Sequence, residues 1–115
     1  MEAINIQFSV LQERYRNTMP EKRVVLEHAW ELMCSDLKNP AGLKELFPLV
    51  HRLAGSASSY GFEHLGDAAL RVHDILDRHR VRGGQLEPAD VAALVHELKP
   101  QMEQLIQALA LETDR

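Results

Sequence analysis

The sequence predicts an all-α protein, an up-down antiparallel four-helix bundle with an additional N-terminal helix. Its apolar residues recur at the spacing of amphipathic helices, and no segment alternates long enough to predict a sheet. Aromatic residues are only 5% of the chain, while good helix formers such as Leu, Ala and Glu dominate. Short joints rich in capping and turn residues separate the apolar stretches. The 115 residues are enough for one core, so we expect a single domain over residues 1–115.

The first two helices are predicted over residues 3–17 and from Thr18 to about Leu37. Thr18 is placed to cap the second helix, because Pro20 follows in its first turn. Cys34 lies at the edge of the apolar stripe of the second helix and is expected to be buried. The stripe of the first helix is Ile4, Phe8, Leu11 and Tyr15, and that of the second is Val25, Leu26, Ala29, Trp30, Met33 and Leu37.

The third helix is predicted to follow an Asn39–Pro40 cap and to run to Tyr60, with Gly61 in a left-handed conformation at its end. Pro48 within it, and Pro100 within the fifth helix, are each expected to kink the helix or to start a new segment. The core face of the third helix is predicted to consist of Leu46, Leu49, Leu53 and Tyr60, with Val50 and Ala57 at its edge.

The fourth helix is predicted over residues 62–79 and the fifth from Pro88 onward, with a loop at residues 81–85 between them. The stripe of the fourth helix is Leu65, Ala68, Ala69, Val72, Ile75 and Leu76, and that of the fifth is Val91, Leu94, Val95, Leu98, Met102, Leu105, Ile106 and Leu109.

His51 does not fit the core pattern of the third helix. At about 100° per residue, it points almost directly away from the core face. Ala54, Gly55 and Ser58 lie around it, where an exposed helical face would ordinarily carry long polar side chains. A glycine inside a helix costs ~1 kcal/mol relative to alanine. Gly55 on the outward face therefore indicates a surface kept open for a partner.

The twelve residues from His51 to Phe62, HRLAGSASSYGF, resemble the signature of histidine-containing phosphotransfer (HPt) domains. They are similar in particular to the form also seen in the phosphotransfer domain of chemotaxis kinases. The family pattern is a histidine, any residue, an aliphatic residue, usually lysine, glycine and then small residues, closing on an aromatic–glycine–aromatic end. The predicted bundle and the chain length fit the family across nearly the whole chain.

This resemblance implies that His51 is the phosphoryl acceptor. Its imidazole would attack the aspartyl phosphate of a receiver domain and pass the phosphoryl group to another receiver. Gly55 and Ser58 would allow the receiver to approach, and Phe47 and Ala54 would lie where it docks. No cofactor is expected on this chain, because the receiver carries the divalent metal ion that helps to neutralise the phosphoryl oxygens.

Ala54 departs from the family pattern, in which a lysine at this position steadies the phosphoryl oxygens. The possible replacements are Arg52, next to His51 but turned ~100° from it around the helix, and Lys44, one-and-a-half to two turns before His51. Phe47 has two interpretations. It is either an exposed anchor for the receiver or, if Pro48 bends the helix, a residue turned into the bundle.

The other five of the six histidines have surface or joint interpretations: His28, His64, His73, His79 and His96. None of them forms a metal-binding spacing within one helix, so no metal site is expected.

Composition, charge and the absence of certain motifs argue against several classes of function. The net charge of −4 argues against nucleic acid as a partner, and no apolar run reaches the length of a membrane span. The single cysteine and the absence of a signal peptide predict a cytoplasmic protein. Nothing resembles a nucleotide-binding loop, so no autokinase activity is expected.

We therefore expect a monomeric phosphorelay intermediate. The Met1 start and the complete bundle favour a free-standing protein over a domain cut from a hybrid kinase, and both alternatives stay open. Its partners would be the receiver domains of response regulators and hybrid sensor kinases. Two alternatives stay open: a helical adaptor that binds a signalling partner without phosphate, and a histidine-based metal-binding bundle.

Overall fold

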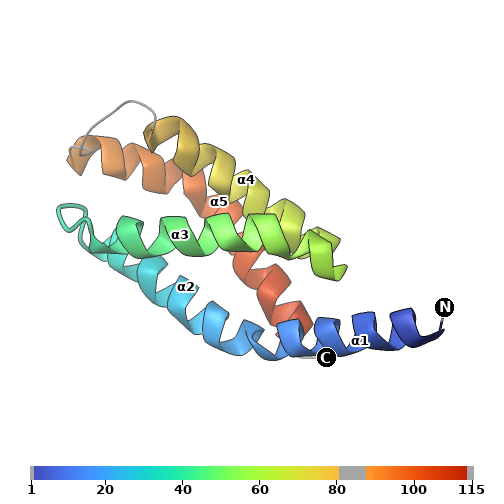
Figure 1. The fold of residues 1–115 in the computed structure, drawn as a ribbon. Helices are drawn as coiled ribbons and strands as arrows, with labels where there is room; N and C mark the ends of the chain where they lie inside the picture. Colours follow the sequence, from blue (N-terminus) through green and yellow to red (C-terminus); the bar gives the residue numbers. More distant parts are fainter. Residues whose placement is uncertain (1, 81–87, 114–115) are drawn as a thin grey trace.

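A computed structural model describes residues 2–80 and 88–113 (Figure 1). Within these residues it contains the helices α1 (Glu2–Asn17), α2 (Met19–Ser35), α3 (Ala41–Ser56), α4 (Glu63–Arg80) and α5 (Pro88–Thr113), with one turn of 3-10 helix, η1 (Ser58–Tyr60), after α3. No described residue belongs to a strand, so the all-α prediction is confirmed. The loop predicted at residues 81–85 lies outside the described residues.

Helices α2 to α5 form a four-helix bundle. Helix α2 packs against α3 and α5, and α4 packs against the same two helices. Successive helices of the bundle run in alternating directions in Figure 1. Helix α1 extends past one end of the bundle. Its backbone comes close to η1, α2 and α5, and its Tyr15 side chain reaches Ser56 at the end of α3. This is the additional N-terminal helix that the sequence predicts.

The apolar stripes predicted for α3, α4 and α5 supply most of the core. A leucine fully buried in such a core contributes about 2 kcal/mol relative to an exposed one, so these stripes hold the bundle together. The buried residues are Leu46, Leu49, Val50, Leu53 and Ala57 of α3 and its C-cap, Leu65, Ala68, Ala69, Val72, Ile75 and Leu76 of α4, and Leu94, Leu98, Met102, Leu105 and Leu109 of α5.

The predictions for α1 and α2 are partly wrong. Phe8 and Leu11 are 41% and 44% exposed, because this part of α1 lies beyond the bundle and has little to pack against. Of the α1 side chains that the structure describes, from residue 6 onward, only Tyr15 joins the core; the predicted stripe residue Ile4 lies outside them. Val25 and Cys34 of α2 are also exposed. The Cys34 side chain is exposed overall, but its thiol is partly shielded from water, and this raises the pKa of the thiol.

The two predicted helix starts are each correct in part. The side-chain Oδ1 of Asn39 accepts a hydrogen bond from the backbone N–H of Ala41 at 3.0 Å, but the N-cap residue of α3 is Pro40, one residue later than predicted. Thr18 is the N-cap residue of α2, as predicted, but its side chain makes no capping hydrogen bond. Its hydroxyl donates instead to the carbonyl of Tyr15 at 2.6 Å.

Pro48 and Pro100 both lie within continuous helices, α3 and α5, so neither starts a new segment. Both side chains are exposed, as expected from their positions off the apolar stripes. A proline on the outer face removes one backbone hydrogen bond without disturbing the core.

Helix α3 ends at Ser56, earlier than the sequence predicts, and η1 continues the chain to Tyr60. Gly61 then adopts the predicted left-handed conformation, with φ of 86°, which residues with a side chain rarely adopt. The earlier end corrects one premise about Gly55: it lies in the last turn of α3 and not in the helix interior.

Candidate functional site

His51 lies on the outer face of α3, opposite the buried stripe, as the sequence predicts. Gly55, one helical turn further along, is exposed as well. A Cβ atom placed on Gly55 would meet no atom of another element within 4 Å. The surface next to His51 is therefore open to an approaching molecule.

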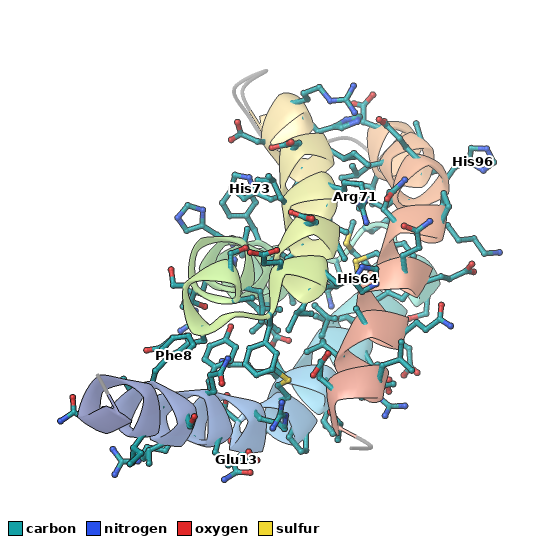
Figure 2. All side chains as sticks on the ribbon, turned by 90° about the vertical axis from the view of Figure 1, so that its right-hand side faces the viewer. Phe8, Glu13, His64, Arg71, His73 and His96 are labelled. Carbon is teal, nitrogen blue, oxygen red and sulfur yellow. The ribbon has the colours of Figure 1, made fainter. Side chains whose placement is uncertain are left out.

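His51 pairs with a second histidine, His73 of α4. The Nδ1 atom of His51 lies 3.0 Å from Nε2 of His73, and the ring centroids are 5.0 Å apart. Figure 2 shows His73 on the side of α4 that faces α3, far from His96 on α5. Because the hydrogen bond occupies Nδ1 of His51, Nε2 is the ring nitrogen left for chemistry.

The surface or joint interpretation of His73 is wrong, since its side chain is only 18% exposed and belongs to this pair. One signal in the sequence could have revealed it. In a hairpin of two antiparallel helices, residues equally distant from the turn lie at about the same level of the two helices, and they meet when both lie on the shared face. His51 and His73 each lie eleven residues from Phe62, in the turn between α3 and α4.

Phe47 borders the histidine pair. It is partly buried and packs against the core. Its ring lies nearly parallel to that of His51, with centroids 6.3 Å apart, and 5.6 Å from the ring of His73. Of the two interpretations of Phe47, the structure favours the partly inward one, achieved without a break at Pro48.

The position of the missing lysine is partly enclosed: Ala54 is half-buried and packs against the core. Arg52 lies on the α2 side of α3, where it lines a hollow together with Lys22 and Val25. There, burial chiefly lowers the pKa of Lys22, and the charge of Arg52 lowers it further. Lys44 is exposed and lines a groove at the other end of α3. The structure does not bring Arg52 and Lys44 together around Ala54.

Ser58, the first residue of η1 after α3, lies close against α4. A Cβ atom on Gly66 of α4 would collide with Oγ of Ser58 and would lie 3.2 Å from its backbone nitrogen. Ser58 is seven residues beyond His51, about 10 Å along a helix. Ser58 therefore contacts α4, where α4 packs near the end of α3.

Helix α1 supports the end of α3 from the other side. Oγ of Ser56 donates a hydrogen bond to the carbonyl of Arg52 at 2.7 Å. The serine proton is thereby used, so the hydroxyl of Tyr15 is the donor in its 2.8 Å contact with Oγ of Ser56. Burial raises the pKa of Tyr15, which keeps this hydroxyl protonated. Gln12 adds a hydrogen bond to the carbonyl of Tyr60 at 2.9 Å.

The other four histidines lie away from the pair. His28, His64 and His96 are exposed, and His79 bonds Glu97 of α5 at 3.0 Å, in agreement with their surface or joint interpretations. Across residues 2–80 and 88–113, no three His, Cys, Asp or Glu side chains gather in a way that could hold a metal ion.

The helices in the described part of the chain are too short or too polar to cross a lipid bilayer.

The comparison with known proteins agrees with this arrangement. A family model described as Hpt domain matches residues 10–112. No curated protein and no solved structure matches the chain. The family match extends from the middle of α1 to the end of α5, so it covers the whole bundle and the segment from His51 to Phe62. The chain therefore belongs to the Hpt domain family.

Proposed function

We propose that Nε2 of His51 accepts the phosphoryl group from the aspartyl phosphate of one receiver domain and passes it to the aspartate of another. As an Hpt domain, the chain serves histidine phosphotransfer in phosphorelays and works with receiver domains. The proposal adds the acceptor atom and the direction of transfer.

The observation that carries this proposal is the combination of an exposed His51 with an open surface at Gly55. Transfer between two proteins requires the aspartyl phosphate to come within bonding distance of the imidazole nitrogen. A long side chain at Gly55 would obstruct that approach. A neutral imidazole near neutral pH has one nitrogen lone pair and is a competent nucleophile.

The remaining site residues have supporting roles in this proposal. Phe47 and Ala54 form the edge of the surface on which the receiver docks, next to Gly55. Arg52 and Lys44 flank α3 and attract the acidic receiver site over a longer range. Ser58 keeps the end of α3 close to α4, so that the approach to His51 stays open.

We further propose that the chain is a monomeric cytoplasmic intermediate without kinase activity or a cofactor of its own. The divalent ion of the receiver would neutralise the transferring phosphoryl oxygens, since this chemistry depends on positioning and electrostatics.

The test is transfer from receiver domains charged with radiolabelled acetyl phosphate. We expect an acid-labile label on the wild-type protein and none on His51→Gln. His96→Gln is the matched control, because His96 is an exposed histidine on another helix, and it should label like the wild type. A label that survives His51→Gln would disprove the assignment. Absence of label from every receiver would favour an adaptor.

A further inference from the structure

We propose that His73 is a positioning residue of this site: it sets which nitrogen of His51 reacts and takes up the proton that becomes acidic on phosphorylation. This inference rests on the proposed function. It starts from the 3.0 Å contact between Nδ1 of His51 and Nε2 of His73, two rings on neighbouring helices.

The direction of the hydrogen bond follows from the surroundings of His73. Its Nδ1 atom is buried and has no hydrogen-bond partner. The nearest acidic group is Asp74, with Oδ1 3.7 Å from that nitrogen. A carboxylate attracts an N–H and repels a nitrogen lone pair, so Asp74 favours the form of His73 with its proton on Nδ1. Nε2 of His73 then bears a lone pair and accepts the hydrogen bond.

His51 must therefore donate through Nδ1. A neutral imidazole carries one proton, so Nε2 of His51 has the free lone pair. Without a partner at Nδ1, the proton of His51 would be free to occupy Nε2, and the ring would present an N–H to the phosphoryl group instead of a nucleophile. The pair with His73 thus keeps Nε2 of His51 in the reactive form.

Few other charges act on His73. Helix α3 contributes His51 and the apolar ring of Phe47, and η1 consists of Ser and Tyr residues only. The ion pairs that join α4 to α5 use Arg78, His79 and Glu97, more than one turn further along α4. On α4 itself, Asp77 is exposed one turn beyond His73. Among the described residues, Asp74 is the acidic group with a carboxylate oxygen within 4.0 Å of a ring nitrogen of His73.

In the transfer step, the Nε2 lone pair of His51 attacks phosphorus. The bond between phosphorus and the aspartyl oxygen breaks, and its electron pair stays on the receiver carboxylate. The phosphorylated ring of His51 is left positively charged, with its proton on Nδ1. That proton moves to Nε2 of His73, which becomes an imidazolium. Return of the proton to Nδ1 makes the ring a better leaving group for the outgoing transfer.

The same proton transfer compensates for the lysine that the family pattern has at the position of Ala54. With alanine in place of lysine, no cation stands at that position to face the phosphoryl group. The imidazolium of His73 supplies a positive charge beside the phosphorylated ring of His51, in a half-buried setting where charges interact more strongly than in water.

The first experiment measures the tautomer of His51 by NMR of the ¹⁵N-histidine-labelled protein, without phosphate or receiver. We expect protonated Nδ1 and unprotonated Nε2 in the wild type. His73→Leu should lose this preference, whereas His73→Gln should keep it, because the Gln carbonyl can accept the same hydrogen bond. His96→Gln is the control. An unchanged tautomer in His73→Leu would overturn the inference.

The second experiment measures transfer and proton uptake. In the wild-type phosphoprotein, we expect the NMR signals of His73 to become those of an imidazolium; a neutral His73 would refute proton uptake. His73→Leu should slow transfer from a receiver about 10-fold or more. His73→Gln should be intermediate, because glutamine orients His51 but cannot take up its proton. Wild-type rates in His73→Gln would count against proton uptake, and wild-type rates in His73→Leu against the whole inference.

The two proposals can fail separately. Label that survives His51→Gln would refute the acceptor, whereas the tautomer measurement concerns the unphosphorylated pair alone. Loss of label in His51→Gln together with full activity in His73→Leu would retain the acceptor and reject His73.

Discussion

The hydroxyl of Tyr15 on α1 donates a hydrogen bond to Oγ of Ser56 on α3, at 2.8 Å. This bond joins the N-terminal helix to the last turn of the helix that carries His51. The stacking of Tyr15 on Tyr60, with centroids 4.6 Å apart, and the hydrogen bond from Gln12 to the carbonyl of Tyr60 strengthen the same contact.

Tyr15→Phe should lower the free energy of unfolding by about 1 kcal/mol, since it removes the hydrogen bond and keeps the ring. Ser56→Ala should cost a similar amount or more, because it also removes the bond to the carbonyl of Arg52. Urea unfolding of both single variants and the double variant measures the effect. We expect the double variant to lose less than the two single losses together. Strict additivity would show that the two hydroxyls do not interact.

Gly55→Ala should stabilise the protein by about 0.5–1 kcal/mol, because a Cβ there meets open space and alanine favours the helix. Thermal unfolding measures this gain. Gly55→Glu should fold equally well but slow transfer from a receiver about 10-fold, through obstruction and charge repulsion beside His51. Normal transfer in Gly55→Glu would contradict the argument that the small residues keep this surface open.

Gly66→Ala should have the opposite effect on stability. Its Cβ would press on Ser58, including a backbone nitrogen 3.2 Å away that cannot rotate aside. Forcing α4 away from η1 should cost about 1–3 kcal/mol. The same unfolding experiment, with Gly55→Ala as the matched variant, tests this difference in sign. Equal stability of Gly66→Ala and the wild type would mean that the close approach is easily relieved.

Ala54→Lys should keep or increase the rate of transfer. The aliphatic part of a lysine can lie along the half-buried Ala54 position while its ammonium reaches solvent beside the phosphoryl group. We expect a longer lifetime of the phosphohistidine, measured as loss of label after removal of the receiver. Ala54→Gln is the uncharged control of similar length. Slower transfer in a folded Ala54→Lys would argue against a missing charge at this site.

The ion pairs of Glu97 should make part of the stability depend on pH. The hydrogen bond from His79 chiefly lowers the pKa of Glu97, and the charge of Arg78, 2.6 Å away, adds to it. A lowered pKa in the folded state stabilises the fold above the unfolded value of ~4.3 and ceases to do so as the pH falls through the folded value.

Glu97→Gln should therefore lower stability near neutral pH by about 0.5 kcal/mol, a small effect because the pair is exposed. The difference from the wild type should shrink in acid, below pH ~4. Melting temperatures of both proteins over this range provide the measurement. A difference that grows on acidification would have the wrong sign for this account.

The spacing of apolar residues predicted much of the fold, but it predicted buried residues correctly only in helices that another helix covers. The stripes of α4 and α5 were predictable because both helices are enclosed in the bundle. Phe8 and Leu11 show the same spacing and are exposed. Periodicity shows which face of a helix is apolar, and it does not show whether another helix covers that face.

The candidate site likewise has a part that could be predicted from the sequence and a part that could not. The outward position of His51 and the open surface at Gly55 follow from the geometry of one helix. The role of His73 depends on the register between two helices, set by how α3 ends in η1 and Gly61. The sequence indicated the left-handed conformation of Gly61 but placed the end of the α-helix four residues too late. Counting eleven residues to either side of Phe62 would have placed His51 and His73 at the same level of the two helices.

The pair of histidines has a consequence for the unfolded chain. His51 and His73 are brought together only when α3 and α4 are packed, since they are far apart in sequence. A chain whose two helices have separated still carries His51 but no longer has His73 beside it. If His73 acts as proposed, competence for phosphotransfer is coupled to folding, and a damaged or newly made chain would accept little phosphate from the relay until its bundle has closed.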